Sequence, residues 1–382
     1  MNSLLILINL TKRKAKNMDI SNKITENQYR SIVEGSMIAI GILSLSRVVS
    51  RYALQDAWIS VIIGGIYPVI VVILASFIDK KMNGYSFEKI NDKIYGKFLS
   101  KIILTVFAIR FVFSEATVIS GFSNISRIVI IPFIPPYIII VILSLLTVYT
   151  AINGLTLVGR LCEVVSYLVI MMVIISIAFL FKGNMINIRP IFASFKNIIL
   201  AIPDSLYSYV GIELSYIVIH FITNKTNSRK AGLQAVLFTI VTYASSVFAT
   251  IYCLGWEISS KNLYPILYLS STLEISLIEN LRTTLMVIWA FVIFRILVCY
   301  LFASAYCISK VLNIKYKASV MTAIIPSVIG SIFMIPEYNR TDILNKVTPY
   351  IVGLGMLWGI ITSIIIIIKN KKVLNNSSKK GD

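Results

Sequence analysis

The sequence is short of charge, and above all of acidic charge. Only 14% of its 382 residues are charged, with 17 aspartates and glutamates against 36 lysines and arginines. In a soluble protein of this length, about a quarter of the residues are charged. The mean hydropathy is +0.84, and several apolar runs reach the roughly 20 residues that cross a bilayer. These features exclude an ordinary soluble domain and predict an all-α polytopic membrane protein.

Histidine and cysteine are also scarce. His220 is the only histidine, and Cys162, Cys253, Cys299 and Cys307 show no CxxC spacing. We therefore expect no metal site, no disulfide framework and no cofactor. The sequence has no Walker loop, no GxGxxG fingerprint and no nucleophile elbow, so nothing in it indicates an enzyme.

The basic excess, a net charge of +19, has two interpretations. In a soluble protein it would suggest nucleic acid, whereas in a membrane protein it follows from the positive-inside rule. Lysine and arginine concentrate before the first span, in 79–101, in 223–232 and in the tail, all of which share one side. We therefore expect both termini in the cytoplasm and no nucleic-acid partner.

Hydropathy predicts about ten transmembrane helices. The organisation expected is a cytoplasmic segment 1–26, a ten-helix membrane domain 27–370 and a basic cytoplasmic tail 371–382. Met1 and Met18 both remain possible starts. The spans lie near 30–48, 57–78, 102–126, 137–152, 161–181, 198–222, 233–255, 277–308, 318–335 and 348–368.

The segment 79–101 has an amphipathic pattern. Phe87, Ile90, Ile94 and Phe98 recur at helical spacing with lysines between them. This pattern predicts a helix that lies on the anionic inner leaflet. Docking to a cytoplasmic partner is the alternative.

Two spans, 27–50 and 198–222, carry residues that spoil a straight helix. Glycine and proline cost a helix interior about 1 and about 3 kcal/mol, and unpaired backbone in a membrane is tolerated where it lines a cavity. The interruptions are Gly35, Ser36 and Gly41 in the first segment, and Pro203, Ser205, Ser208 and Gly211 in the second.

The broken spans are the first and the sixth of the ten, which divides the chain into five and five. An odd number of spans per half inverts the halves in the membrane. The residues from Gly41 to Ser44 also resemble those from Gly211 to Ser215, with one insertion. We therefore predict an inverted 5+5 repeat of the amino-acid permease type, with broken helices 1 and 6 around a solute site.

In the first span, small residues could bring a ligand close to the backbone. Free N–H groups at a helix break favour an anion such as a small carboxylate. The candidates are Gly35, Ser36, Ala39 and Gly41. Close helix packing through small residues is the alternative.

In the sixth span, Tyr207, Tyr209, Gly211 and Glu213 crowd together. A carboxylate near mid-membrane is costly and usually functional, so Glu213 is expected to be protonated, to bind the ligand's amino group or to pair with an arginine. The tyrosines would supply aromatic walls, or serve ordinary packing.

The third and eighth spans add Glu115 and Trp289 to the candidate ligand-binding residues. Arg110 is expected to meet an acid from another span, because Glu115 lies on a different face of its helix. Glu279 and Arg282 could pair along the eighth span.

Arg295 lies deep in the eighth span, where a buried arginine needs a carboxylate. The partners considered are Glu115, Glu163 and Glu213.

These segments resemble the endospore germination permeases, the B subunits of nutrient germinant receptors in the amino acid–polyamine–organocation superfamily. The similar stretches are ISNKITENQY, GSMIAIGILSLS, YVGIELS and IENLRTTLMVIWAF. Relatives often end the second motif with proline, where this chain has Ser46. The resemblance implies a spore inner-membrane subunit that senses a small nutrient, often an amino acid. It also implies assembly with an A-type membrane subunit and a C-type lipoprotein subunit.

Three functions stay open on the sequence. The first is a receptor subunit that binds a nutrient between spans one and six and triggers germination. The second is a proton-coupled amino acid transporter that works through Glu213, and the third is a membrane scaffold without a ligand.

Overall fold

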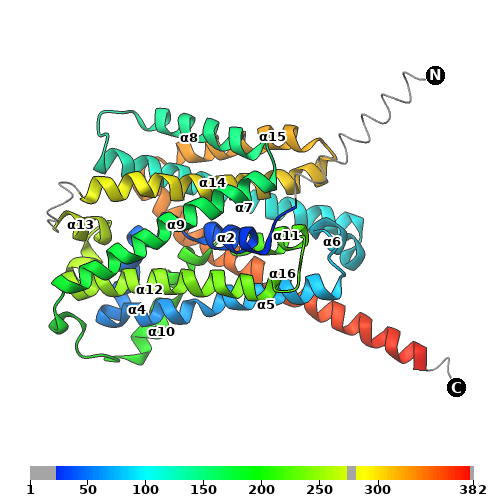
Figure 1. Ribbon diagram of the computed structural model, residues 1–382, viewed down its shortest axis with the longest axis horizontal. Coiled ribbons are helices and arrows are strands. Elements are labelled where there is room, and N and C mark those ends of the chain that lie inside the picture. Colours follow the sequence, from blue (N-terminus) through cyan, green and yellow to red (C-terminus); the bar gives the residue numbers. More distant parts are fainter. Residues whose placement is uncertain (1–22, 273–280, 379–382) are drawn as a thin grey trace.

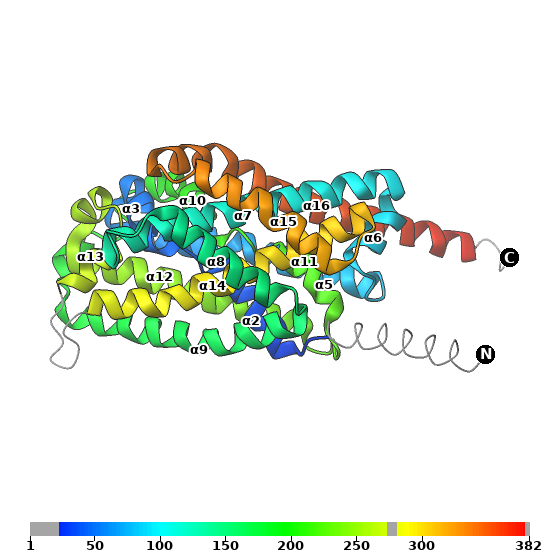
Figure 2. The ribbon, with the colours of Figure 1, turned by 90° about the horizontal axis from the view of Figure 1, so that it is seen from above.

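The computed structural model describes residues 23–272 and 281–378, and helices run through most of them (Figure 1). The helices lie side by side along one long axis, as the view from above confirms (Figure 2). The first described helix, α2 (Glu26–Met37), starts near the end of the bundle at which the last, α16 (Glu337–Ser378), finishes. We call this the termini end. Met1, Met18 and most of the predicted segment 1–26 lie outside the described residues.

The first span is broken, as predicted. A capping box starts α2: the Thr25 hydroxyl accepts from the Gln28 amide, and the Gln28 side chain accepts from the Thr25 amide, each at 3.1 Å. The helix stops where Ile38 turns extended, at φ −74° and ψ 103°. The span resumes as α3 (Gly41–Ala53). Three residues therefore separate the two half-helices.

The sixth span is broken as well, but not at its proline. Pro203 lies inside α10 (Phe195–Tyr209), which continues six residues beyond it. The break comes at Gly211, whose φ of +112° is one that residues with a Cβ rarely adopt. The span resumes as α11 (Leu214–Val218). The prediction that Pro203 interrupts this span is therefore wrong, and the left-handed backbone of Gly211 marks the break.

All ten predicted spans are present as helices. Short helices between them cap or cross the ends of the bundle. The second span comprises η1 (Leu54–Asp56), α4 (Ala57–Gly64) and α5 (Ile66–Lys81), and the remaining elements are α6 (Phe87–Tyr95), α7 (Lys97–Val129), α8 (Pro136–Ala151), α9 (Leu155–Phe179), η2 (Leu180–Lys182), η3 (Met185–Ile188), η4 (Ile219–Phe221), α12 (Ser228–Lys261), α13 (Pro265–Ser271), α14 (Leu281–Leu312) and α15 (Tyr316–Phe333).

Seven segments of the described chain are long and apolar enough to cross a membrane by length and composition. One of them, Gly41–Lys81, joins half of the first span to the second. The halves of the sixth span and the 16-residue α8 are too short to qualify. Breaks and one short helix thus account for the difference between seven long segments and ten spans.

The two halves of the chain run in opposite directions. The amide of Ile24, just before α2, donates to the Phe221 carbonyl at 3.1 Å, and the Thr223 amide donates to the Ile24 carbonyl at 3.0 Å. The start of the first span thus lies beside the end of the sixth. Within the bundle, α3 packs against α10. This arrangement is the inverted 5+5 repeat, with the two breaks facing each other.

The amphipathic helix α6 does not turn its apolar face to lipid. Phe87 and Ile90 are buried, and the Phe87 ring lies 5.0 Å from that of Phe107 and 4.9 Å from that of Trp358. The Trp358 indole N–H also donates to the Asn91 side chain at 2.9 Å. The prediction of a surface helix is therefore wrong for these residues, because α7 and α16 already cover the face that the pattern marks as apolar.

Candidate ligand-binding site

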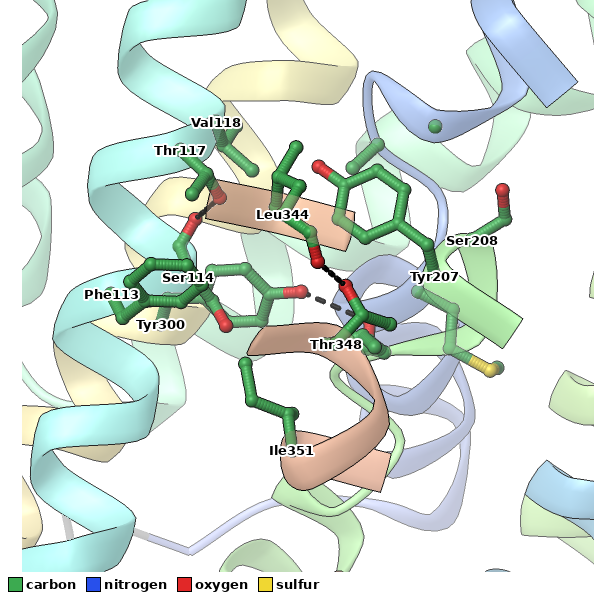
Figure 3. A pocket seen from close by; sticks show the side chains of 14 residues that line it. Phe113, Ser114, Thr117, Val118, Tyr207, Ser208, Tyr300, Leu344, Thr348 and Ile351 are labelled. Carbon is green, nitrogen blue, oxygen red and sulfur yellow. Dashed lines mark hydrogen bonds between the residues drawn. The ribbon is translucent and has the colours of Figure 1, made fainter. Parts of the chain in front are cut away.

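A cavity lies between the two breaks (Figure 3). Side chains of α7 face Tyr207 across it, and α16 closes a third side. No charged side chain is among the residues that line it. They are Met37, Ala39, Gly41, Phe113, Ser114, Thr117, Val118, Tyr207, Ser208, Val210, Tyr300, Leu344, Thr348 and Ile351.

Gly41 lies at a close contact between the two broken spans. A Cβ at Gly41 would come within 2.8 Å of the Ser208 hydroxyl and 3.2 Å of the Ser208 Cα. Gly41 is also the first residue of α3, and the N-cap residue Ile40 provides no side-chain cap. The glycine therefore serves close packing, one of the two alternatives that the sequence left open.

Glu213 belongs to a buried network beside the cavity. Its carboxylate accepts hydrogen bonds from Arg110 and from the Tyr67 hydroxyl, and a third from the Gly211 amide at 3.1 Å. Glu213 is fully buried, and Gly355 of α16 packs so closely on it that a Cβ there would clash. The expected pairing of Arg110 with an acid from another span is confirmed. This carboxylate ties four spans together and does not line the cavity.

The partner of Arg295 is Glu34, at 3.0 Å. The Ser166 hydroxyl joins the pair, accepting from Arg295 and donating to Glu34, each at 3.2 Å. The prediction of Glu115, Glu163 or Glu213 as partner is therefore wrong. Glu34 lies next to Gly35, and a Cβ at Gly35 would come within 2.9 Å of the arginine stem. The lack of a side chain at Gly35 therefore leaves space for Arg295, and Gly35 does not line the cavity.

Two tyrosine hydroxyls hold the breaks together. Tyr243 lies 2.8 Å from both the Met37 and the Ser208 carbonyl oxygens. Tyr300 lies 2.9 Å from the Ser36 carbonyl oxygen and 3.1 Å from that of Val210. Carbonyl groups released by a break need such donors in a membrane.

The sequence analysis missed these tyrosines and Glu34. Tyr243 and Tyr300 are tyrosines inside predicted spans, where the hydroxyl needs a hydrogen-bond partner, and this is the signal that was available. Ser36 and Gly211 meet directly at this point, because a Cβ at Gly211 would clash with the Ser36 carbonyl.

The other candidate residues are distributed around the cavity. Ala39 and Tyr207 line it, as does Gly41. Tyr209 is turned away and donates to the Val61 carbonyl at 2.9 Å. Glu115 faces α15, where it accepts from Ser327 at 2.7 Å.

Two candidates of the eighth span remain. Trp289 lines a second cavity. The predicted pair of Arg282 involves Glu279, which lies outside the described residues.

The fold and the site define the class of protein: a helical membrane protein with an inverted repeat and a cavity between two broken helices. A family profile described as "Spore germination protein" matches residues 23–342, so the chain belongs to that family.

Similar curated proteins are consistent with this. Spore germination protein YndE of Bacillus subtilis (strain 168) is 25% identical over 329 residues, covering 85% of this chain and 90% of that protein. Spore germination protein GerQB of Bacillus cereus is 22% identical over 336 residues, covering 85% and 92%.

Solved structures share the fold at low identity. MhsT in complex with L-phenylalanine gives a TM-score of 0.66 at 12% identity, over 90% of this chain and 88% of that one. A substrate-bound, outward-open Na⁺-coupled sialic acid symporter gives a TM-score of 0.66 at 13% identity, over 91% and 88%. This likeness establishes the transporter fold.

Proposed function

We propose that the chain is the membrane subunit of a spore germinant receptor and binds a small nutrient amino acid in the cavity between the breaks. The observation that carries this proposal is an uncharged, hydroxyl-bearing cavity that contacts the uncapped start of α3. The nutrient would favour one of two conformations and thereby trigger germination, which requires different affinities for the two states.

The ligand's carboxylate would lie at the start of α3. The first amides of a helix have no partner within the helix, and its dipole favours a negative charge there. Ala39 and Gly41 bring the cavity to this backbone. Ser114 and Thr117 supply hydroxyl groups on the opposite wall.

The ligand's ammonium group would lie near Tyr300. The hydroxyl of this tyrosine has one hydrogen, yet it lies within hydrogen-bonding distance of two carbonyl oxygens, those of Ser36 and Val210. At any moment the hydroxyl donates to only one of these oxygens, so the other carbonyl oxygen could accept a hydrogen bond from the ligand's ammonium group. The apolar side chains of Met37 and Phe113 also line the cavity, where they would contact an uncharged side chain of the ligand.

Pairing among the charged residues supports a receptor. Glu213 pairs with Arg110 and Glu34 pairs with Arg295 within the protein, so neither carboxylate needs a bound cation to remain buried. We further propose, from the family and the distribution of basic residues, that the protein resides in the spore inner membrane with both termini in the cytoplasm. Its partners would be an A-type membrane subunit and a C-type lipoprotein subunit.

One observation favours a proton-coupled amino acid transporter as the second candidate. Glu115 is fully buried with no cationic partner among the described residues, and one of its carboxylate oxygens has no hydrogen-bond partner there. A buried acid of this kind is a candidate to carry a proton. It would replace Glu213, to which the sequence analysis gave that role.

Reconstitution into proteoliposomes separates the two functions. Radiolabelled amino acids are screened one at a time for saturable binding and for uptake against a gradient, with and without an imposed proton gradient. Binding without uphill uptake supports the receptor, and uphill uptake that requires the proton gradient supports the transporter. Absence of binding for every amino acid would contradict both.

A further inference from the structure

A second cavity lies on the other side of the first break. Helices α3, α9, α12, α13 and α14 surround it. It shares no lining residue with the nutrient cavity. Its lining consists of Ile38, Ile42, Leu43, Val169, Met172, Val173, Ile175, Ser176, Phe179, Thr242, Ile266, Leu267, Leu285 and Trp289.

The lining is apolar apart from three groups, and only one of these is a free donor. The Thr242 hydroxyl donates to the Phe238 carbonyl at 2.8 Å, and the Ser176 hydroxyl donates to the Met172 carbonyl at 3.0 Å. Trp289 is only 3% exposed, yet its indole N–H has no acceptor within the part of the chain that the structure describes.

An unpaired buried donor is unusual enough to require an explanation. Apolar cavities in proteins stay dry and bind compact apolar molecules. A ligand that covers the apolar walls and presents one acceptor to the indole would satisfy both the cavity and the donor. A charged ligand is excluded, because no side chain that lines the cavity carries a compensating charge.

We propose that this cavity is a second ligand site, which takes a compact, uncharged, largely apolar molecule with a single hydrogen-bond acceptor directed at Trp289. The site is separate from the nutrient cavity and does not depend on the nutrient for its own binding energy.

The first break is the wall between the two sites. Ile38 and Ile42 line the second cavity, whereas Ala39 and Gly41 line the nutrient cavity. A ligand that packs on the isoleucines therefore biases the position of the backbone that the nutrient contacts. Such coupling changes each ligand's affinity by the same factor, typically about 5- to 150-fold. This step, unlike the site itself, rests on the proposed function.

The site is tested by photolabelling of the full-length protein in lipid nanodiscs. The probe is cyclohexanone with a diazirine at the ring carbon opposite the carbonyl, and the matched control is the same diazirine ring without the carbonyl. Peptides that contain Trp289, Leu285 and residues 172–179 are expected to be labelled saturably. Labelling that rises linearly with probe and follows lipid exposure would overturn the site.

Two variants test its chemistry. Trp289→Phe keeps an aromatic ring, although a smaller one, and removes the donor, so the affinity for the ketone should fall about five- to tenfold more than the affinity for the control ring. Val169→Phe should block labelling by both molecules, because the larger ring fills the cavity. Equal loss of both molecules in Trp289→Phe would contradict an acceptor at the indole.

Coupling is then measured as nutrient affinity at saturating cyclohexanone. A shift of at least about fivefold, matched by an equal shift in ketone affinity at saturating nutrient, supports coupling. Unchanged nutrient affinity in protein with a saturated second site overturns it. If no amino acid binds but saturable labelling persists, the proposed function fails and the second site stands.

Discussion

At the scale of single residues, this protein keeps charge in its membrane core by pairing it. Arg295 and Glu213 are fully buried, and Arg110 and Glu34 nearly so. Each has a partner from a span distant in sequence. Desolvation of such pairs offsets much of their attraction, but the loss of one partner strands the other. These residues therefore contribute mainly to specificity, because any other arrangement of the spans would leave a buried charge without its partner.

Replacing Glu213 with glutamine should destabilise the protein. The change leaves the buried Arg110 guanidinium without an anion, a loss of about 3–5 kcal/mol for a broken buried pair. The measurement is thermal unfolding of the protein in nanodiscs. A double variant with Arg110→Met should recover much of the loss, and an unchanged melting temperature for Glu213→Gln alone would refute the account.

Glu115→Gln, in contrast, should be tolerated. The amide oxygen can still accept from the Ser327 hydroxyl, and no cation among the described residues loses its partner. We expect a change in stability below about 1.5 kcal/mol, the size of one ordinary hydrogen bond. Unfolding under the same conditions provides the comparison. If the variant instead abolishes uphill uptake of an amino acid, the transporter becomes the better function.

At the scale of elements, the two breaks depend on a few tight contacts. Gly41 accommodates Ser208, and Gly211 lies against the Ser36 carbonyl. Tyr243 and Tyr300 then bind the carbonyl oxygens that the breaks release. These contacts hold the half-helices in register.

Gly41→Ala should push the broken spans apart and weaken nutrient binding at least about tenfold, because the new methyl group collides with the Ser208 hydroxyl. The double variant Gly41→Ala/Ser208→Ala should recover much of the affinity. Gly353→Ala is the matched control, since a Cβ there meets nothing within 4 Å. Wild-type affinity in the single variant would show that this contact does not shape the site. Equilibrium binding of labelled amino acids measures all three.

Tyr300→Phe should weaken nutrient binding and also lower stability, by about 1–3 kcal/mol for a buried carbonyl left without a donor. The ring and its packing on Phe111, with centroids 5.9 Å apart, are retained. Binding and unfolding are measured on the same preparation. An affinity loss without a change in stability would indicate that the hydroxyl contacts the ligand but does not brace the breaks.

The elements were the most predictable part of the structure, for a physical reason. A span must be apolar over its whole length, so hydropathy located all ten. The exact break in the sixth span was less accessible, because a membrane helix tolerates Pro203 while only Gly211 takes the left-handed backbone. Pairing of Glu34 with Arg295 joins residues far apart in sequence. Several acids could serve a buried arginine, and only the packing of spans decides between them.

At the scale of the whole molecule, the termini end is closed by contacts between the halves. Lys225 pairs with Asp79 at 2.6 Å, and the Glu26 carboxylate accepts from the Asn227 amide, also at 2.6 Å. The backbone bridge between Ile24 and Ile222 lies beside them. Opening the solute cavity toward this end would require these contacts to separate.

Lys225→Met should loosen this closure. We expect faster amide hydrogen exchange at Ile24 and Thr223, whose N–H groups donate hydrogen bonds across the contact between the two halves. We call this contact the seam. Exchange in α15 should be unaffected. Mass spectrometry of exchanged peptides gives the readout. Lys346→Met removes an exposed pair with Asp342 and should change nothing at the seam. Equal exchange in both variants would mean that Lys225 does not hold the halves together.

The bridge at Ile24 also has a practical consequence for handling the protein. Ile24, the second of the described residues, itself forms the backbone bridge between the halves. A reporter or purification handle fused there would load the backbone pairing that closes the bundle. A handle placed after α16, whose last turns extend beyond the bundle at the same end (Figure 1), would lie farther from that pairing. Carboxy-terminal fusions are therefore the ones to use when the response of the protein to a ligand is to be measured.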